Sequence, residues 1–131
     1  MSIMVETRVG RRHTERELPL TVSGAGVAID ALDGHDTTVT VFERDGYSLY
    51  VGGGPDRFSV TYMTPAGNGY TLVLNPDAEE TEEITLGGQR INFPVRDLVC
   101  REAADKAAGE FVQTGSVKLT PEWRLDTAHT S

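Results

Sequence analysis

The chain has 131 residues, of which 38% are hydrophobic and 24% are charged, a balance typical of a folded protein and not of a disordered one. This length fits one domain spanning residues 1–131. A formal net charge of −8 argues against nucleic-acid binding, because polyanions are bound by clustered lysine and arginine. No segment is apolar and long enough to cross a membrane, and the amino-terminal residues lack the pattern of a signal peptide. We therefore expect a cytoplasmic protein.

The amino-terminal segments predict a strand, a polar connection and a helix. Residues 3–9 are rich in β-branched side chains and predict the first strand. The polar, mainly basic segment 11–17 predicts a turn or loop. Apolar residues then recur at helical spacing, with Thr21 or Ser23 as the N-cap and Gly34 just past the end.

The middle of the chain predicts a run of antiparallel strands. Four segments are rich in β-branched and aromatic residues and are separated by short turns. Connections this short join antiparallel strands, because a parallel crossover needs roughly a dozen residues or more. The region 83–93 predicts one further short strand, or a hairpin bent at Gly87 and Gly88. The four segments are residues 37–43, 47–53, 57–63 and 69–75.

The period becomes helical after Pro94. Pro94 suits a first helical turn, and Gly115 suits the end of the helix. Cys100 lies on the predicted apolar face, so we interpret it as a small core residue. That face contains Val99, Cys100, Ala103, Ala104, Ala107 and Phe111.

A last short strand is predicted over residues 121–126, followed by a frayed tail at 128–131. The element order is then β-α-β-β-β-β-β-α-β. This order predicts an α+β fold, with an antiparallel β-sheet and two helices packed on one face.

The sequence does not predict a catalytic centre. The glycines of segment 51–57 resemble a phosphate-binding loop, but a strand follows them and not a helix, so we interpret the segment as a tight hairpin turn. His13, His35 and His129 lie in separate segments without the spacing of a zinc site. The single cysteine excludes an internal disulfide. We therefore expect no enzymatic activity, no cofactor and no metal.

An acidic run, NPDAEETEE at residues 75–83, contains no lysine or arginine. Three interpretations of this run are considered: a solvated loop, a metal site, or a negative surface for a positive partner. Calcium takes roughly six to eight oxygen ligands, but the carboxylate spacing does not match an EF-hand and the run has no glycine for the sharp turn. The solvated loop and the partner surface stay open. The carboxylates are those of Asp77, Glu79, Glu80, Glu82 and Glu83.

The carboxy-terminal third resembles the Imm1 family of immunity proteins from bacterial polymorphic-toxin systems. The resemblance is specific over residues 91–123 and looser elsewhere, notably in the glycine-rich first helix and in 83–92. Its motif residues are mostly apolar, so they identify a scaffold and not a binding site. They are Phe93, Pro94, Leu98, Val99, Ala103, Glu110, Phe111, Gly115, Pro121 and Trp123.

This resemblance implies an antitoxin, a non-catalytic protein that binds a cognate toxin and occludes its active site. Toxins associated with the family include nucleic-acid deaminases, whose active sites hold phosphates and are usually lined with positive charge. An acidic inhibitor suits such a site, and the acidic run is then the expected toxin-binding segment. We expect a monomer or weak homodimer that binds its toxin, and neither nucleic acid nor membrane.

Electrostatic steering raises the association rate more than the affinity, so a buried anchor is also expected. The candidates are Tyr47, Tyr50, Tyr62 and Tyr70.

Two other functions remain open. The first is a small-ligand-binding or isomerase-like α+β domain, with a pocket between sheet and helices lined by Tyr50, Tyr62, His35 or Asp56. A deep cavity there would favour it. The second is a module that self-associates through an exposed sheet edge.

Overall fold

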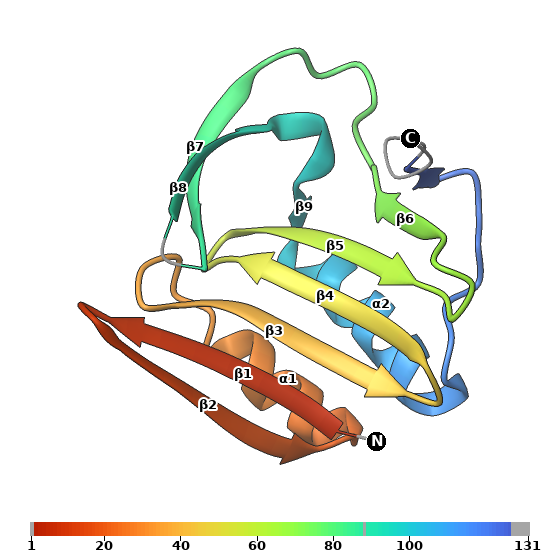
Figure 1. The fold of residues 1–131 in the computed structure, drawn as a ribbon. Helices are drawn as coiled ribbons and strands as arrows, with labels where there is room; N and C mark the ends of the chain where they lie inside the picture. Colours follow the sequence, from red (N-terminus) through yellow and green to blue (C-terminus); the bar gives the residue numbers. More distant parts are fainter. Residues whose placement is uncertain (1, 88, 127–131) are drawn as a thin grey trace.

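The computed structural model describes residues 2–87 and 89–126, in which one large antiparallel sheet carries both helices on the same face (Figure 1). This sheet has eight strands in the order β10-β6-β5-β4-β3-β1-β2, with β9 paired to β5. The predicted α+β fold is therefore confirmed. The strands are β1 (Ser2–Val9), β2 (Arg12–Pro19), β3 (Thr37–Arg44), β4 (Tyr47–Gly53), β5 (Arg57–Met63), β6 (Gly69–Leu72), β7 (Thr81–Leu86), β8 (Gln89–Pro94), β9 (Val99–Cys100) and β10 (Trp123–Leu125); the helices are α1 (Val22–Asp30) and α2 (Arg101–Thr114), with a 3-10 turn at Val95–Asp97.

The prediction of a turn or loop over residues 11–17 is wrong except at Arg11, which lies in the turn, because residues 12–17 belong to strand β2. This strand pairs with β1 along its whole length, from Ser2 opposite Pro19 to Val9 opposite Arg12. Its side chains are almost all exposed, so no apolar alternation marks it. The strand forms because β1 supplies hydrogen-bond partners for its backbone, and a charged edge strand is one way in which proteins avoid aggregation.

Helix α1 begins at Val22 and is capped by Thr21, whose side-chain oxygen accepts a hydrogen bond from the Gly24 amide at 2.9 Å. This settles the choice between Thr21 and Ser23 as the N-cap. A Cβ added to Gly24 would lie 2.3 Å from the carbonyl oxygen of Pro19. A glycine that lowers the helix propensity of the sequence therefore allows the chain to approach the first turn closely.

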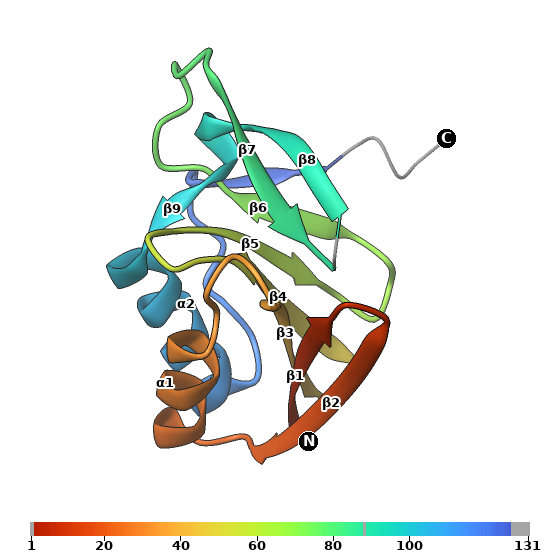
Figure 2. The same cartoon turned by 90° about the vertical axis from the view of Figure 1, so that its left-hand side faces the viewer.

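Residues 81–94 form a hairpin, β7–β8, which is a separate two-stranded sheet. The hairpin alternative for this region is therefore confirmed. Its tip reaches the main sheet on the face opposite the helices (Figure 2). There the Gly87 amide donates to the Thr38 hydroxyl at 2.8 Å, and a Cβ on Gly52 would lie 2.6 Å from Leu86 Cδ2. Gly52 thus leaves space for Leu86 to pack on the sheet.

Helix α2 begins at Arg101, later than predicted, because residues 95–100 take other conformations. Val99 and Cys100 form strand β9 and pair with β5. Successive residues of a strand point to opposite sides, so Val99 is buried while Cys100 is exposed. The prediction of Cys100 as a core residue is therefore wrong. The helix ends as predicted at Gly115, whose φ is 79°.

The core lies between the sheet and the two helices. Its largest fully buried side chains include Phe42, Phe58 and Phe111. The small residues Ala104 and Ala108 of α2 are also fully buried, which lets the helix pack close to the sheet. Within the described residues, neither helix is long and apolar enough to cross a membrane. The tail predicted at 128–131 lies outside these residues.

Candidate functional site

Three of the four tyrosines considered as partner anchors lie in an aromatic cluster on the helix-covered face. Tyr62 is at its centre and is buried. Burial raises the pKa of its phenol above the usual 10.0, with a contribution from neighbouring Tyr47. The ring centroid of Tyr62 lies 6.0–6.4 Å from those of Tyr47, Tyr70, Phe111 and Trp123. Tyr62 and Phe111 are buried in the core, and the other three rings are partly buried against it, so the cluster serves mainly to pack the core.

Tyr50 differs from the other three tyrosines. It lies on β4 between buried Leu49 and Val51, and alternation directs it to the face without helices. Its exposed fraction is 42%. Of the four candidates, Tyr50 has the exposure that a contact with another protein requires.

The acidic run extends from the segment after β6 into strand β7, and all five carboxylate-bearing residues are exposed. Glu82 Oε2 accepts a hydrogen bond from Arg57 Nη1 at 3.0 Å, and Glu83 Oε1 lies 3.5 Å from Arg90 Nη1. Part of the negative charge is thus balanced by arginines outside the run. In the portion of the chain that the structure describes, no ion pair involves the other three carboxylates, those of Asp77, Glu79 and Glu80.

Side chains with metal-ligand spacing occur elsewhere, on the β1–β2 hairpin. Ligand atoms of Glu6, His13 and Glu15 lie within 4.8 Å of one another. The group cannot be recognised from spacing in the sequence, because it is the strand register, with Glu6 opposite Glu15, that brings its members together. The Arg8 guanidinium donates to Glu6 at 2.7 Å and, chiefly through this hydrogen bond, lowers the pKa of that carboxyl. Glu6 Oε1 thus pairs with Arg8, while Glu6 Oε2 lies 3.3 Å from His13 Nε2.

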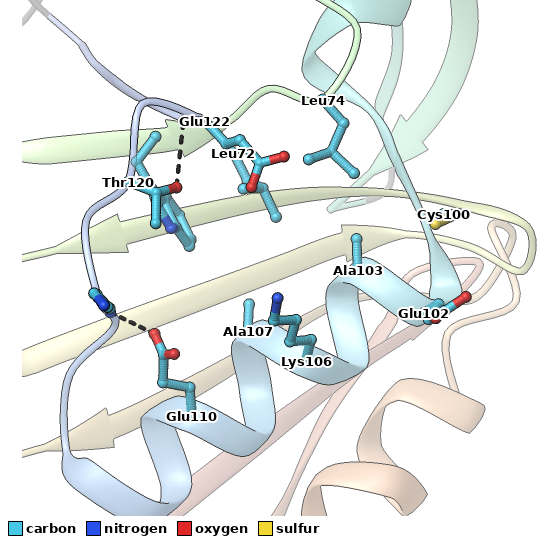
Figure 3. Close-up of a pocket in the computed structure, with 12 residues that line it drawn as sticks. Leu72, Leu74, Cys100, Glu102, Ala103, Lys106, Ala107, Glu110, Thr120 and Glu122 are labelled. Atoms are coloured by element: carbon cyan, nitrogen blue, oxygen red, sulfur yellow. Dashed lines mark hydrogen bonds between the residues drawn. The ribbon is translucent and has the colours of Figure 1, made fainter.

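A groove of about 510 Å³ lies between α2 and the strand end where β6 meets β10 (Figure 3). Its apolar side chains come from Leu72, Leu74, Ala103, Ala107 and Trp123, and its polar ones include Glu102, Lys106, Glu110, Lys118, Thr120 and Glu122.

The Glu110 carboxylate accepts a hydrogen bond from the backbone amide of Lys118 across one end of this groove. Among the described residues that line it, none is one of the four predicted for a ligand pocket. Those four are Tyr50, Tyr62, His35 and Asp56, so this groove differs from the pocket expected for a ligand-binding domain. The groove lies beside α2, whereas the interface between the sheet and this helix is packed with the fully buried Ala104 and Ala108, which counts against a ligand pocket there.

A second hollow, of about 430 Å³, lies where the tips of the two hairpins approach the loop between α1 and β3. His35 is the one residue of the predicted ligand pocket found there, and its Nδ1 lies 2.7 Å from Asp36 Oδ1. The hollow is lined by Arg8, Gly10, His35, Asp36, Thr85, Gly87 and Gln89.

Asp33 organises the loop between α1 and β3. Its Oδ1 accepts hydrogen bonds from the amides of His35 at 2.8 Å, Asp36 at 2.9 Å and Thr37 at 3.1 Å. Burial opposes the charged form, but these hydrogen bonds outweigh it and hold the pKa of Asp33 below its usual 3.8. The interpretation of Asp33 as part of a helix-terminating loop agrees with this geometry.

The lowered pKa of Asp33 makes its contribution to stability dependent on pH. A carboxyl with a lower pKa in the folded state stabilises the protein above the unfolded pKa, and this effect is lost as pH falls through the folded-state pKa. Asp33→Asn should therefore be less stable than wild type at neutral pH, and the difference should shrink below about pH 3.8. Urea unfolding of wild type and variant at neutral pH and below about pH 3.8 measures this difference in stability. An equal difference at both would show that the charge of Asp33 is not involved.

An ion pair that the sequence does not predict joins exposed Arg124 of β10 to buried Asp97 in the turn before α2. Asp97 is buried and accepts two hydrogen bonds from Arg124, at 2.8 and 3.1 Å. These hydrogen bonds, more than the further contact with Asp126, raise the pKa of Arg124. The partners are 27 residues apart, so local spacing gives no signal for the pair. The pair connects strand β10 to the 3-10 turn at Val95–Asp97.

Comparison with protein families identifies the scaffold. The family described as Immunity protein Imm1 matches residues 14–125. The chain belongs to the Imm1 family. A comparison with curated proteins found no match. In this Imm1 protein the motif residues Leu98, Val99 and Phe111 are buried and Trp123 is half-buried, as expected for scaffold residues. Membership of this family supports an antitoxin role and implies that the chain binds a cognate toxin.

Proposed function

We propose that this Imm1 protein is an antitoxin that binds a cognate bacterial toxin and blocks its active site. The observation that carries the proposal is the family match over residues 14–125. Immunity proteins of this kind are generally non-catalytic and act by binding. Immunity genes normally lie directly beside the genes of their toxins, so the toxin domain is taken from the adjacent gene. Size-exclusion chromatography of a mixture of the two purified proteins tests for a stable complex. Separate elution of the two proteins at micromolar concentration would contradict the proposal.

We further propose that the toxin acts on nucleic acid, as a deaminase does. An enzyme of this class must hold phosphates, so its active site is rich in positive charge. The net charge of −8 on this chain suits such a partner. If occlusion is the mechanism, the complex should neither bind nor deaminate a single-stranded oligonucleotide. A complex that still binds the oligonucleotide would point to inhibition away from the active site.

In this proposal the acidic run, with Asp77, Glu79, Glu80, Glu82 and Glu83, accelerates association by attracting the positive toxin. Glu79 and Glu80 make no ion pair among the described residues, so they contribute the least compensated charge. Replacing both by glutamine should slow association several-fold at low salt and change dissociation little. The difference should fade as ionic strength rises, because the Debye length shrinks from roughly 30 Å at 0.01 M to 8 Å at 0.15 M.

The control for this prediction is a variant with the same change in charge elsewhere. Glu102 and Glu122 are also exposed but lie at the groove beside α2. Association rates with the toxin are measured by stopped flow for two double variants, Glu79→Gln/Glu80→Gln and Glu102→Gln/Glu122→Gln. The comparison distinguishes the effect of charge at the acidic run from the effect of net charge. Equal association rates for the two variants would show that the acidic run is a solvated loop without a specific role in association.

The groove beside α2 supports a second candidate function, small-ligand binding. Its volume of about 510 Å³ falls within the roughly 300–1,000 Å³ of small-molecule sites. Leu74 and Ala103 offer apolar contacts, while Lys106 and Glu110 offer polar ones. Ligand-observed NMR with a fragment set distinguishes this function from an antitoxin without a ligand. Binding that is lost in Ala103→Phe, which narrows the groove, would support it.

A further inference from the structure

The β7–β8 hairpin lies over one part of the face of the main sheet opposite the helices, and no other helix or strand of residues 2–87 and 89–126 covers this face (Figure 2). Ile3 and Val5 of β1 are buried toward the helices, so alternation directs Met4 and Glu6 to the other side. Both helices lie behind the sheet in Figure 1, which therefore shows this side. We call it the open face. By strand register it carries Met4 and Glu6 of β1, Glu15 and Glu17 of β2, Val41 and Glu43 of β3, Ser48 and Tyr50 of β4, and Thr61 and Met63 of β5.

Strand β2 separates its charges between the two faces. Glu17 lies opposite Met4, and Glu15 lies opposite Glu6, so both belong to the open face. Arg16 lies opposite Val5 and projects to the other face. The segment that looks mainly basic in the sequence thus adds carboxylates, and not its arginines, to the open face.

The excess of negative charge extends to the next strands. Glu43 of β3 joins the open face by register with Ser48. Arg8 is the nearby arginine on this side, and it is paired with Glu6 at 2.7 Å. This end of the open face is therefore acidic.

A continuous row of paired residues leads from this acidic end to Tyr50. Met4 pairs with Val41, Val41 with Tyr50, and Tyr50 with Thr61. Met4, Val41 and Thr61 are half-buried, whereas Tyr50 is 42% exposed. The row places an apolar, aromatic centre beside the carboxylates of β2. Tyrosine is enriched among the residues that dominate binding energy at protein interfaces.

We infer that the open face is the docking surface of this chain, and that it takes a cationic protein surface with an apolar centre that packs on Tyr50. The inference rests on the proposed function, because it assigns the binding of the toxin to one face. Glu15, Glu17 and Glu43 meet basic residues of the partner around the contact with Tyr50. The tip of the β7–β8 hairpin, where Leu86 lies over Gly52 and Gly87 lies near Glu6, bounds one edge of this surface (Figure 2).

Two variants of matched exposure test this assignment. Tyr50, 42% exposed, belongs to the open face, and Leu74, 40% exposed, belongs to the groove beside α2. The probe is the toxin domain encoded by the adjacent gene, made catalytically inactive. Tyr50→Ala should weaken its binding about tenfold or more through faster dissociation, whereas Leu74→Ala should bind as wild type does. Thermal unfolding of both variants close to wild type shows that each one folds.

A charge reversal gives a second, independent test. Glu15→Lys/Glu17→Lys should weaken binding and slow association, while Glu102→Lys/Glu122→Lys, with the same change in net charge, should have a smaller effect. Loss of binding in Leu74→Ala together with unchanged binding in Tyr50→Ala would overturn the open face in favour of the groove. A wild-type chain that does not bind the probe at all would instead overturn the proposed function.

Discussion

Replacing Phe111 by alanine should lower the free energy of unfolding by about 3–5 kcal/mol, since this is the usual cost of truncating a fully buried phenylalanine. The ring is fully buried in the core between α2 and the sheet. It meets Tyr62 edge-on, with 6.4 Å between the ring centroids. The truncation removes this aromatic contact and leaves a cavity under the helix.

Urea unfolding followed by circular dichroism measures the effect of Phe111→Ala. The matched control is Gln113→Ala on the same helix, where an exposed side chain is truncated and the change should stay within about 0.5 kcal/mol. A loss below about 1 kcal/mol for Phe111→Ala would show that the helix does not pack on the sheet as described. The binding surfaces proposed for the chain would then have to be derived from a different arrangement of helix and sheet.

The second large effect is expected at Gly34, in the loop after α1. Its φ is +74°, and a Cβ added there would lie 2.2 Å from the carbonyl oxygen of Gly54. The added Cβ would meet a backbone atom, and not the end of a flexible side chain that could move away. Gly34→Ala should therefore destabilise the protein by about 2 kcal/mol or more, combining a strained backbone with a steric clash.

Gly26→Ala is the control for this substitution. Gly26 lies within α1, and a Cβ added there would have nothing within 4 Å. In a helix, alanine is favoured over glycine by about 0.8–1 kcal/mol, so this variant should be more stable than wild type. Opposite signs for the two variants in thermal unfolding are the expected result. A neutral Gly34→Ala would contradict the close packing of the two turns.

The same contact explains the glycines that resemble a phosphate loop. Gly53 and Gly54 have φ values of +95° and +90°. A Cβ on Gly54 would lie 2.4 Å from the Leu32 carbonyl oxygen. The hairpin prediction from the sequence is therefore confirmed. The reason for successive glycines is the approach of a neighbouring loop, and local turn chemistry alone does not reveal it.

The strands β3 to β6 follow from the sequence because each has β-branched and aromatic residues and the turns between them are short. Strand β2 does not, because an edge strand has no buried face and takes its partner from β1. The start of α2 is misplaced for a related reason. Val99 is apolar at a helical position, but its burial comes from pairing with β5 in an extended conformation.

The sequence gives little of the candidate binding surface, because three-dimensional proximity decides it. The acidic run is visible in the sequence, yet the arginine that pairs with Glu82 lies 25 residues away. Four tyrosines look equivalent in sequence, and only burial separates Tyr50 from Tyr62 and its neighbours. Similarly, Glu15 and Glu17 fall in a segment that appears basic until the strand register places them on the open face.

The most direct test of the antitoxin function is a growth measurement. Bacterial cells that express the active toxin domain encoded by the adjacent gene should stop growing. Co-expression of this Imm1 protein should restore growth, whereas co-expression of the destabilised Phe111→Ala variant should protect less well. Growth arrest that persists with the folded wild-type chain present in excess would contradict the proposed function.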